Sequence, residues 1–298
     1  MKILLLGKNG QVGWELQRSL APLGELVALD RHSTGLCGDL ANLAGISATV
    51  RQMQPDVIVN AAAYTAVDKA ESDAATAYAV NAEAPGVLAE AASAVGAWLV
   101  HYSTDYVFDG SGSQPWEEGA PTGPLNVYGR TKLEGEQRIV ARCAKHLILR
   151  TSWVYSARGG NFAKTMLRLA KERDHLTVID DQFGAPTGAE LLADVTAHMV
   201  RSALTGAAGR FAGIYHVAAA GETSWHGYAR FVLECASWAG LALKASSSTV
   251  DPVPTAAFPT PAVRPHNSRL NTAKLQDSFG LYLPTWQQGV ARMLTEIT

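Results

Sequence analysis

Two side chains that can move a proton lie four residues apart in the segment YGRTK (128–132). Tyr128 and Lys132 stand at positions i and i+4, which share one face of an α-helix. A phenol with its ordinary pKa of about 10 is a poor proton shuttle at neutral pH. A neighbouring ammonium, together with the positive ring of an oxidised nicotinamide, favours the phenolate and lowers that pKa. In isolation such a pair is more often part of a surface helix, so its surroundings must decide its role.

A hydroxyl group follows the apolar run at 98–103, which predicts a strand buried in a parallel sheet. Ligands collect at the carboxyl ends of strands in open parallel sheets, and Thr104 stands at such an end. We therefore expect Thr104 to hydrogen-bond a carbonyl oxygen of the substrate alongside Tyr128. The candidate catalytic residues are Thr104, Tyr128 and Lys132.

A glycine-rich segment, GKNGQVG (7–13), separates the first apolar run from the first helical pattern. In such a loop one glycine permits the tight turn, another lets backbone N–H groups approach a pyrophosphate, and a third allows close helix–strand packing. The helix N-terminus then faces the anion. The spacing G-x-x-G-x-x-G differs from the G-x-G-x-x-G fingerprint and is a weak signal alone. Because it stands between a predicted strand and a predicted helix, we expect it to bind a dinucleotide.

The residues after the second predicted strand leave the choice between NAD and NADP open. Asp30 suits hydrogen bonds to the ribose hydroxyls of NAD, whereas Arg31 suits the 2′-phosphate of NADP. Asp39 is a candidate contact to the adenine amino group, and the small residues at 61–63 allow a dinucleotide to approach closely. The candidate cofactor-binding residues are Gly7, Gly10, Gln11, Val12, Gly13, Asp30, Arg31, Asp39, Leu40, Ala61, Ala62, Ala63, Thr65, Tyr128 and Lys132.

An alternation of strands and helices must position these residues. In the first predicted helix, Val12, Leu16 and Leu20 share one face. The alternation predicts an α/β fold with a doubly wound parallel sheet and right-handed crossovers. The expected strands cover 3–6, 26–29, 57–60, 98–103 and 147–150, and the expected helices cover 11–22, 43–53, 74–95 and 127–143.

The pattern becomes less regular near residue 150. Further strands are expected at 176–179 and 214–217, and further helices at 162–171, 189–204, 224–240 and from 286 towards 298. The segment 251–265 is too rich in proline for a helix or a central strand, so we interpret it as a connector or binding loop. We expect residues 1–150 to form a dinucleotide-binding domain that also receives later segments. Residues 151–298 are expected to form mainly a smaller, interleaved substrate-binding lobe.

The composition excludes several classes of protein. Lys and Arg number 25 against 27 Asp and Glu, a formal net charge of −2, so a nucleic-acid-binding footprint and a polybasic membrane segment are both missing. No run approaches the roughly 18 apolar residues of a membrane-spanning helix, and the first residues lack the features of a signal peptide. Three widely spaced cysteines favour neither disulfides nor a zinc site. We expect a cytoplasmic protein without nucleic-acid or membrane partners.

In this order along the chain, the motifs resemble those of the extended short-chain dehydrogenases/reductases, and specifically those of the dTDP-4-dehydrorhamnose reductase family. The resemblance covers essentially the whole chain, and its most specific parts are QFGAPT (182–187) and RPHNS (264–268). The other matching segments are GKNGQVG (7–13), NAAAYTAVD (60–68), YSTDYVFDG (102–110), NVYGRTK (126–132) and RTSW (150–153).

The resemblance implies a Rossmann-type fold and a reduction by NADPH or NADH. The reaction would convert the C4 ketone of dTDP-4-dehydro-L-rhamnose to the alcohol of dTDP-L-rhamnose. Tyr128 would give a proton to the C4 oxygen, Thr104 would orient that oxygen, and Lys132 would tune Tyr128 and bind the nicotinamide ribose. Whether the product feeds lipopolysaccharide, another cell-wall polymer or a glycosylated metabolite stays open.

Substrate contacts are also implied. Asp105 and Trp153 match sugar-contacting positions of the family, although a tryptophan here is equally well read as a buried aromatic beside the sheet. Asn161, Gln182 and Arg264 are the candidate contacts to the dTDP base or diphosphate, since a guanidinium pairs bidentately with phosphate.

A metal-assisted contact in a homodimer is a further implication of the resemblance. Glu15 and Glu190 match the positions at which the family holds Mg²⁺ in that contact. Each glutamate alone is more often a solvated helix residue, so the expected Mg²⁺ and the expected homodimer both rest on the resemblance.

Three other functions compete with this interpretation. A nucleotide-sugar 4,6-dehydratase needs a further acid/base pair and resembles S-T-D-E, but Tyr106 stands here in place of the glutamate. A 4-epimerase or another ketosugar reductase shares the glycine loop and the tyrosine–lysine pair. A non-catalytic relative that binds a partner enzyme would have no need to retain Thr104, Tyr128 and Lys132 together. Tyr64 also departs from the histidine expected in close relatives.

Overall fold

The computed structural model describes residues 1–206 and 209–297, and its centre is a six-stranded sheet. Neighbouring strands are all parallel. Five of the strands contain an apolar run at which the sequence predicts a strand, and β10 overlaps the run expected at 214–217, so the predicted parallel sheet is confirmed. In spatial order the strands are β10 (Gly213–His216), β5 (His146–Thr151), β4 (Trp98–Thr104), β3 (Val57–Asn60), β1 (Lys2–Leu6) and β2 (Glu25–Leu29).

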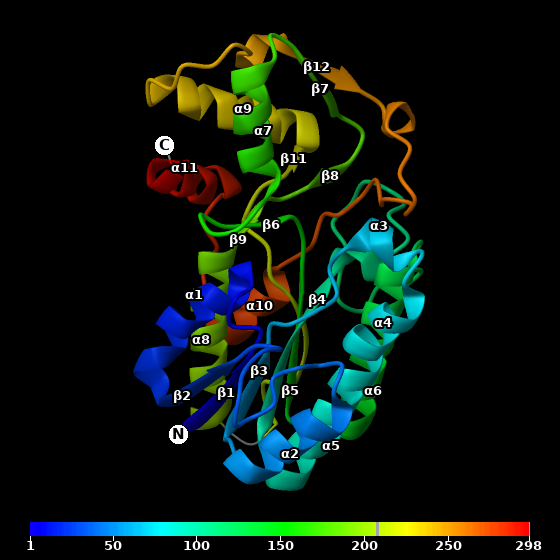
Figure 1. Cartoon of the computed structure of the whole chain (residues 1–298), viewed down its shortest axis with the longest axis vertical. Helices are drawn as coiled ribbons and strands as arrows, with labels where there is room; N and C mark the ends of the chain where they lie inside the picture. The colour runs from blue at the N-terminus through cyan, green and yellow to red at the C-terminus, as the bar shows by residue number, and fades with distance from the viewer. Residues whose placement is uncertain (207–208, 298) are drawn as a thin grey trace.

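Helices cover both faces of this sheet (Figure 1). The alternation of side chains along β1 explains the two layers, because Ile3 and Leu5 pack into one core and Leu4 and Leu6 into the other. The doubly wound arrangement is therefore confirmed. One layer contains α1 (Gln11–Leu20) and α8 (Ala189–Thr205), and the other contains α2 (Leu43–Met53), α5 (Ala84–Val95) and α6 (Val127–Arg142).

The strand order reverses beside β1, which lies between β2 and β3. In open α/β sheets such a reversal creates a crevice at the carboxyl ends of the strands, where ligands bind. The loop after β1, the residues after β3 and the end of β4 all meet at this edge. Ser156 of the second lobe donates a hydrogen bond to Gln11 at the start of α1, so the second lobe borders the same edge.

The predicted helix at 74–95 is interrupted. It consists of α4 (Ala74–Tyr78), a π-helical turn at Ala79–Glu83 and α5. Pro85, in the first turn of α5, lacks an N–H, and its ring clashes with the carbonyl four residues earlier in a regular helix. The wider turn places Asn81 where it accepts a hydrogen bond from the Tyr64 backbone N–H and donates one to the Tyr64 carbonyl.

The rest of the chain forms a second lobe with its own hydrophobic core around Tyr228 (Figure 1). Its helices are α7 (Phe162–Glu172), α9 (Trp225–Trp238) and α11 (Trp286–Ile297), while Thr298 lies outside the described residues. Three small sheets accompany them: β7 (Leu176–Ile179) with β12 (Val250–Val253), β8 (Phe183–Gly184) with β11 (Thr223–Ser224), and β6 (Val154–Tyr155) with β9 (Thr187–Gly188).

The proline-rich segment does not begin as a loop. Asp251 and Pro252 lie in β12, which pairs with β7 in a sheet of only two strands. Both strands are edges there, and an edge strand tolerates the missing N–H of a proline. Two of the helices in the described residues were not predicted, namely α3 (Val67–Ala70) and α10 (Ala273–Phe279). Short 3₁₀ turns also occur, at Ala21–Leu23, Asp105–Val107, Ser247–Thr249 and Thr255–Ala257.

Within the described ranges, none of the helices combines the length and the apolar character that crossing a membrane requires.

Candidate active site

The glycine loop has the tight geometry that its sequence predicts. Gly7 has φ +90°, and a Cβ on it would lie 2.7 Å from the backbone nitrogen of Ala62. A Cβ on Gly13 would lie 2.0 Å from the carbonyl oxygen of Gly7, so glycine there lets α1 pack against the loop. Gly10 is the N-cap of α1, and it has no side chain to cap the first-turn N–H groups. The loop therefore brings the backbone at 61–63 and the amino end of α1 to one place.

The acidic and basic candidates after β2 are both at the surface. Asp30 accepts hydrogen bonds from the His32 backbone N–H at 2.9 Å and from the Asn9 side chain, and the hydrogen bond from His32 is the main cause of its lowered pKa. Arg31 is exposed and directs its Nε to His32. Nothing in this arrangement decides between a ribose hydroxyl and a 2′-phosphate as the preferred partner.

The remaining cofactor candidates differ in their surroundings. The carboxylate of Asp39 accepts a hydrogen bond from the Ala41 backbone N–H at 3.0 Å, which stabilises its own turn. Val12 and Leu40 pack against the two cores of the sheet, and Leu40 is buried. Thr65 is exposed. The structure thus gives Asp39, Val12 and Leu40 packing or turn-forming roles at the border of the predicted cofactor site.

Thr104 and Tyr128 meet at the carboxyl end of β4. Thr104 ends this strand, and its hydroxyl donates to Asp105 Oδ1 at 3.1 Å and accepts a hydrogen bond from the Tyr106 backbone N–H at 3.2 Å. The same hydroxyl is near enough to Tyr128 to lower the pKa of its phenol. Asn126 caps α6 by accepting a hydrogen bond from the Gly129 N–H, which starts the helix two residues before the half-buried Tyr128. The ring of Tyr106 packs edge-on against that of Tyr128, with 5.6 Å between centroids. Thr104 and Tyr128 are therefore close to one another at the edge of the sheet where ligands bind.

The pKa of Tyr128 differs from the expected direction. Its pKa is raised to about 12, mainly by burial and to a smaller extent by the charge of Asp105, while Thr104 acts in the opposite direction. Lys132 turns its Nζ to the Tyr102 carbonyl, and burial lowers the pKa of Lys132 itself to about 8. The expectation that the neighbouring lysine depresses the pKa of Tyr128 is therefore wrong for the chain alone.

Lys132 lies in a buried polar pocket between α6 and the sheet. Its Nζ donates to the Tyr102 carbonyl at 2.6 Å and lies 3.0 Å from His101 Nε2. His101 Nδ1 lies 3.1 Å from the Asn60 amide nitrogen. His101 escaped the sequence analysis, although its place within an otherwise apolar strand was a usable signal.

A buried ion pair lies one turn further along α6. Arg150 donates to both carboxylate oxygens of Glu136, at 2.9 Å from Nε to Oε1 and 2.6 Å from Nη2 to Oε2. Their side chains are only 3% and 2% exposed. Ser103, the neighbour of Thr104, donates its hydroxyl to the same carboxylate. The pair therefore connects β5, α6 and β4 directly behind the candidate catalytic residues, and it was not predicted.

Asp105 is the most unusual carboxyl group in the site. It is 2% exposed, and burial raises its pKa to about 7, against the opposing effects of Ser268 and Thr104. Its Oδ2 has no hydrogen-bond partner within the described part of the chain. A buried, unpartnered carboxyl oxygen next to Thr104 is suited to a hydroxyl group of a ligand.

A cavity of about 330 Å³ opens between Tyr106 and the second lobe. Gln182 and Arg264, both predicted substrate contacts, lie in its lining, together with Phe162 and Trp225, which were not predicted. Arg264 Nη2 donates to Asp68 at 2.7 Å, whereas its buried Nη1 has no partner among the described residues. The cavity thus combines flat aromatic rings with a guanidinium that can donate hydrogen bonds to an anion.

Trp153 and Asn161 differ in how they relate to this cavity. The ring of Trp153 stacks on that of Trp225 with 3.7 Å between centroids, and its backbone has the unusual φ of +49°. It therefore supports one wall of the cavity. Asn161 accepts a hydrogen bond from the Lys164 N–H and donates one to the Ser156 carbonyl. Both ends of its amide are used in capping α7, and it is absent from the cavity lining.

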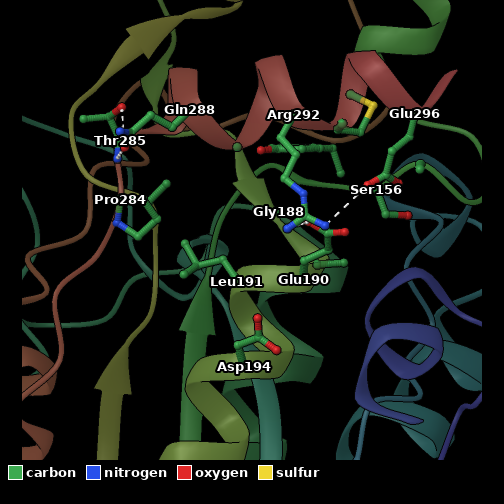
Figure 2. Close-up of a pocket in the computed structure, with 16 residues that line it drawn as sticks. Ser156, Gly188, Glu190, Leu191, Asp194, Pro284, Thr285, Gln288, Arg292 and Glu296 are labelled. Atoms are coloured by element: carbon green, nitrogen blue, oxygen red, sulfur yellow. Dashed lines mark hydrogen bonds and ion pairs between the residues drawn. The ribbon is translucent and has the colours of Figure 1, made fainter. Parts of the chain in front are cut away.

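Glu190, one of the two glutamates predicted to hold Mg²⁺, lines a second pocket of about 230 Å³ (Figure 2). Arg292 reaches from α11 to Glu190 at 3.3 Å and also to Glu296 at 3.5 Å. Burial raises the pKa of Glu190, and the charges of Glu296 and Glu15 act in the same direction. Across residues 1–206 and 209–297, however, no three ligating side chains are grouped as a metal site. One chain therefore does not fit a resident Mg²⁺.

The comparisons with known proteins agree with this geometry. The family model described as the RmlD substrate binding domain matches residues 1–298. A dTDP-4-dehydrorhamnose reductase from Shigella flexneri is 61% identical over 297 residues, covering 100% of this chain and 98% of that protein. The crystal structure of a dTDP-4-dehydrorhamnose reductase from Clostridium acetobutylicum has a TM-score of 0.90 and 34% identity, and covers 100% of this chain and 99% of the other. That of the enzyme from Bacillus anthracis in complex with NADP has a TM-score of 0.88 and 35% identity, with 99% of each chain covered.

A doubly wound sheet whose glycine loop and tyrosine–threonine pair share one edge defines an oxidoreductase of the short-chain dehydrogenase/reductase class. The match of the family model over the whole chain and the identity to the Shigella enzyme narrow this class. The chain belongs to the dTDP-4-dehydrorhamnose reductase family.

Proposed function

We propose that the chain reduces the C4 ketone of dTDP-4-dehydro-L-rhamnose with NADPH or NADH and releases dTDP-L-rhamnose. The observation that carries this proposal is the grouping of the Thr104 and Tyr128 hydroxyls next to Asp105, at the ligand-binding edge of the sheet. The Shigella relative, which is 61% identical, has the name of such a reductase. The Bacillus anthracis neighbour is a complex with NADP.

Tyr128 acts as the proton donor in this proposal. A phenol whose pKa is about 12 carries its proton at neutral pH, so it is ready to donate. Thr104 would hold the oxygen of the substrate next to the phenol, because its hydroxyl lies close enough to Tyr128 to affect the pKa of the phenol. As the C4 oxygen gains negative charge, the proton passes from the phenol to this oxygen and leaves an alcohol.

The nicotinamide cofactor supplies the hydride that arrives at C4. The glycine loop and the amino end of α1 would hold its pyrophosphate, and the residues at 61–63 would border it. Lys132 would hold the ribose of the nicotinamide. It is buried, and its Nζ donates a hydrogen bond to the Tyr102 carbonyl. Asp30 and Arg31 keep both NADH and NADPH as candidates.

The cavity of about 330 Å³ would receive the dTDP portion. The unpartnered Nη1 of Arg264 suits the diphosphate, and the rings of Trp225 and Phe162 suit a flat base. Gln182 already accepts a hydrogen bond from Trp225 Nε1 and donates one to Thr255, so its amide is held in place at the cavity wall. Trp153 would border the deoxysugar through its stacking on Trp225.

Loss of nicotinamide absorbance with freshly prepared dTDP-4-dehydro-L-rhamnose, measured with NADPH and NADH in parallel, tests the proposal. We expect oxidation of the cofactor with an equal amount of dTDP-L-rhamnose formed. Cofactor binding without oxidation would contradict it and would favour another nucleotide ketosugar as substrate. Co-purification with another enzyme and no turnover on any ketosugar would favour the non-catalytic alternative.

We also propose the homodimer that the resemblance implies, with Glu15 and Glu190 of two chains facing a shared Mg²⁺. The carboxylates near Arg292 support it only in part, because one chain does not assemble a complete ligand set. Light scattering after size exclusion, with Mg²⁺ and then with a chelator, tests this proposal. A dimer that a chelator dissociates is expected, and a monomer under both conditions would contradict it.

A further inference from the structure

The polar pocket behind Lys132 contains a chain of hydrogen bonds that joins two strands to α6. Asn60 ends β3 and is 1% exposed, and His101 in the middle of β4 is equally buried. The Asn60 amide nitrogen lies 3.1 Å from His101 Nδ1, and His101 Nε2 lies 3.0 Å from Lys132 Nζ. Whether each side chain donates or accepts a hydrogen bond is therefore constrained by the side chain next to it.

The orientation of the Asn60 amide is fixed by the backbone. Asn60 Oδ1 accepts a hydrogen bond from the Ala62 N–H at 3.1 Å, so the amide nitrogen faces His101. An amide nitrogen only donates, which makes His101 Nδ1 the acceptor. A neutral imidazole with an accepting Nδ1 carries its proton on Nε2, and that N–H points at Lys132. In this arrangement Lys132 must accept, which only a neutral amine can do.

We propose that Asn60 and His101 are positioning residues that control the proton on Lys132. The orientation of the Asn60 amide selects the tautomer of His101, and the tautomer selects whether Lys132 is an accepting amine or a donating ammonium. The proposal rests on the proposed function only where Lys132 takes part in the reaction.

The opposite arrangement shows why the two states differ in free energy. For an ammonium on Lys132, His101 Nε2 must accept and Nδ1 must carry the proton. The Asn60 amide then turns its oxygen to His101, and its nitrogen meets the Ala62 N–H. Two donors face each other there, so the partly buried Ala62 N–H loses its partner, which disfavours this arrangement. The change from ammonium to amine releases one proton in total.

The charged groups around Lys132 agree with this assignment. Glu136, on the same helix, favours the ammonium but is neutralised by Arg150 from β5, and the imidazole of His101 faces Lys132 from β4. Burial lowers the pKa of Lys132 to about 8 and that of His101 well below its usual value. Lys132 is therefore the group that titrates near neutral pH, while His101 stays neutral and changes tautomer.

Long-range ¹H–¹⁵N spectra of the imidazole rings test the proposal in the protein without any ligand. The chain has 8 histidines, and His101→Gln or Asn60→Asp identifies the signals of His101. We expect the proton on Nδ1 at low pH and on Nε2 at high pH, with a midpoint near the pKa of about 8 for Lys132. One unchanged tautomer between about pH 6 and about pH 10 would overturn the proposal, as would a doubly protonated His101 in this range.

Asn60→Asp provides a second test with almost the same shape. A carboxylate accepts from Ala62 and from His101 Nδ1–H at once, so the ammonium form loses no partner. We expect the midpoint of the tautomer change, and that of the pH profile of kcat/KM, to rise by about one unit or more. Asn267→Asp is the control, because Asn267 is 1% exposed as well but contacts Ser111 and Gln114. Equal shifts in the two variants would reject the proposal.

These readouts separate the two proposals of the preceding sections. If the chain fails to reduce dTDP-4-dehydro-L-rhamnose, the proposed function fails, but the spectra still decide how Asn60 and His101 act on Lys132. If turnover occurs and the tautomer of His101 is insensitive to pH, the reductase stands and the role of Asn60 and His101 is refuted.

Discussion

At the scale of single residues, the packing of the Tyr128 ring and the chemistry of its hydroxyl can be tested separately. Its ring packs edge-on against Tyr106, whereas its hydroxyl is engaged with Thr104. Tyr128→Phe keeps the first contact and removes the second. We expect the variant to bind cofactor normally and to lose about 10²-fold or more in kcat, the scale of a lost general acid. Cofactor titration and steady-state kinetics measure the two quantities.

Tyr106→Phe is the matched control for this variant. Tyr106 lies in the cavity lining with Arg264, so its hydroxyl is expected to affect KM more than kcat. Normal turnover by Tyr128→Phe, or an equal loss of kcat in both variants, would refute the assignment of Tyr128 as the proton donor.

The protonation state of Asp105 affects the stability of the fold. Its pKa is about 7 in the folded chain and about 4 when unfolded, so the unfolded state loses the proton first as the pH rises. The contribution of this group to the free energy of unfolding is complete below about pH 4 and is lost by about pH 7. We expect Asp105→Asn to be stabilised relative to the parent chain at pH 8 by roughly 1–4 kcal/mol, and less at acid pH.

Urea unfolding of both proteins at several pH values measures this difference. The sign is the critical result. A variant that is less stable than the parent at alkaline pH would mean that Asp105 is ionised in the folded chain without a penalty, and that its burial does not raise its pKa.

At the scale of the secondary-structure elements, the glycine loop offers a paired test. Gly13→Ala places a Cβ 2.0 Å from the Gly7 carbonyl oxygen, so α1 must move away from β1. Gly10→Ala meets the same oxygen at 3.4 Å, which is an ordinary contact. We expect Gly13→Ala to lose about 1–3 kcal/mol of stability and most of its cofactor affinity, and Gly10→Ala to lose little of either. Thermal unfolding and cofactor titration distinguish them, and similar losses would contradict the packing argument.

The sequence predicted the long elements well and the short ones poorly. Short apolar runs, such as the four residues at 3–6 in β1, are strands because both faces of the sheet are covered. The two-residue strands β6 and β8 form only because distant backbone segments meet, and no local pattern marks them. The π-helical turn follows from Pro85 in the next helix. The strand β12 follows from the edge position of Pro252, which depends on pairing with the distant strand β7.

The same division holds for the candidate site. Local spacing was enough to find Tyr128, Lys132 and the hydroxyl of Thr104, because helix periodicity and strand ends place them. The stacking of Trp153 on Trp225 and the meeting of Asn60 with His101 join residues from separate elements. The pKa of Tyr128 was predicted in the wrong direction because it depends on burial, which a list of neighbours in sequence does not contain.

At the scale of the whole molecule, the Glu136–Arg150 pair holds the layers together behind the site. Arg150→Met leaves the carboxylate of Glu136 buried without a counterion, and we expect it to lower the free energy of unfolding by about 3–5 kcal/mol. The double variant Glu136→Leu/Arg150→Met removes both charges and is expected to recover most of that loss. Urea unfolding measures all three proteins.

The exposed pair of Arg168 and Glu172, with side chains 61% and 53% exposed, provides the control. Arg168→Met is expected to change stability by less than about 1 kcal/mol, because water screens an exposed pair. A double variant no more stable than Arg150→Met would show that the shape of the pair, rather than its charge, is what the layers require.

The position of β10 has a consequence for how the protein is made. This strand comes from residues 213–216 but completes the sheet beside β5, which ends at Thr151. On the ribosome, therefore, the first half emerges with one sheet edge open and with the α1 face still uncovered by α8. An open strand edge can pair with another nascent chain. Until its second half has been synthesised, the first half therefore exposes a sheet edge and a helix face that the folded protein covers.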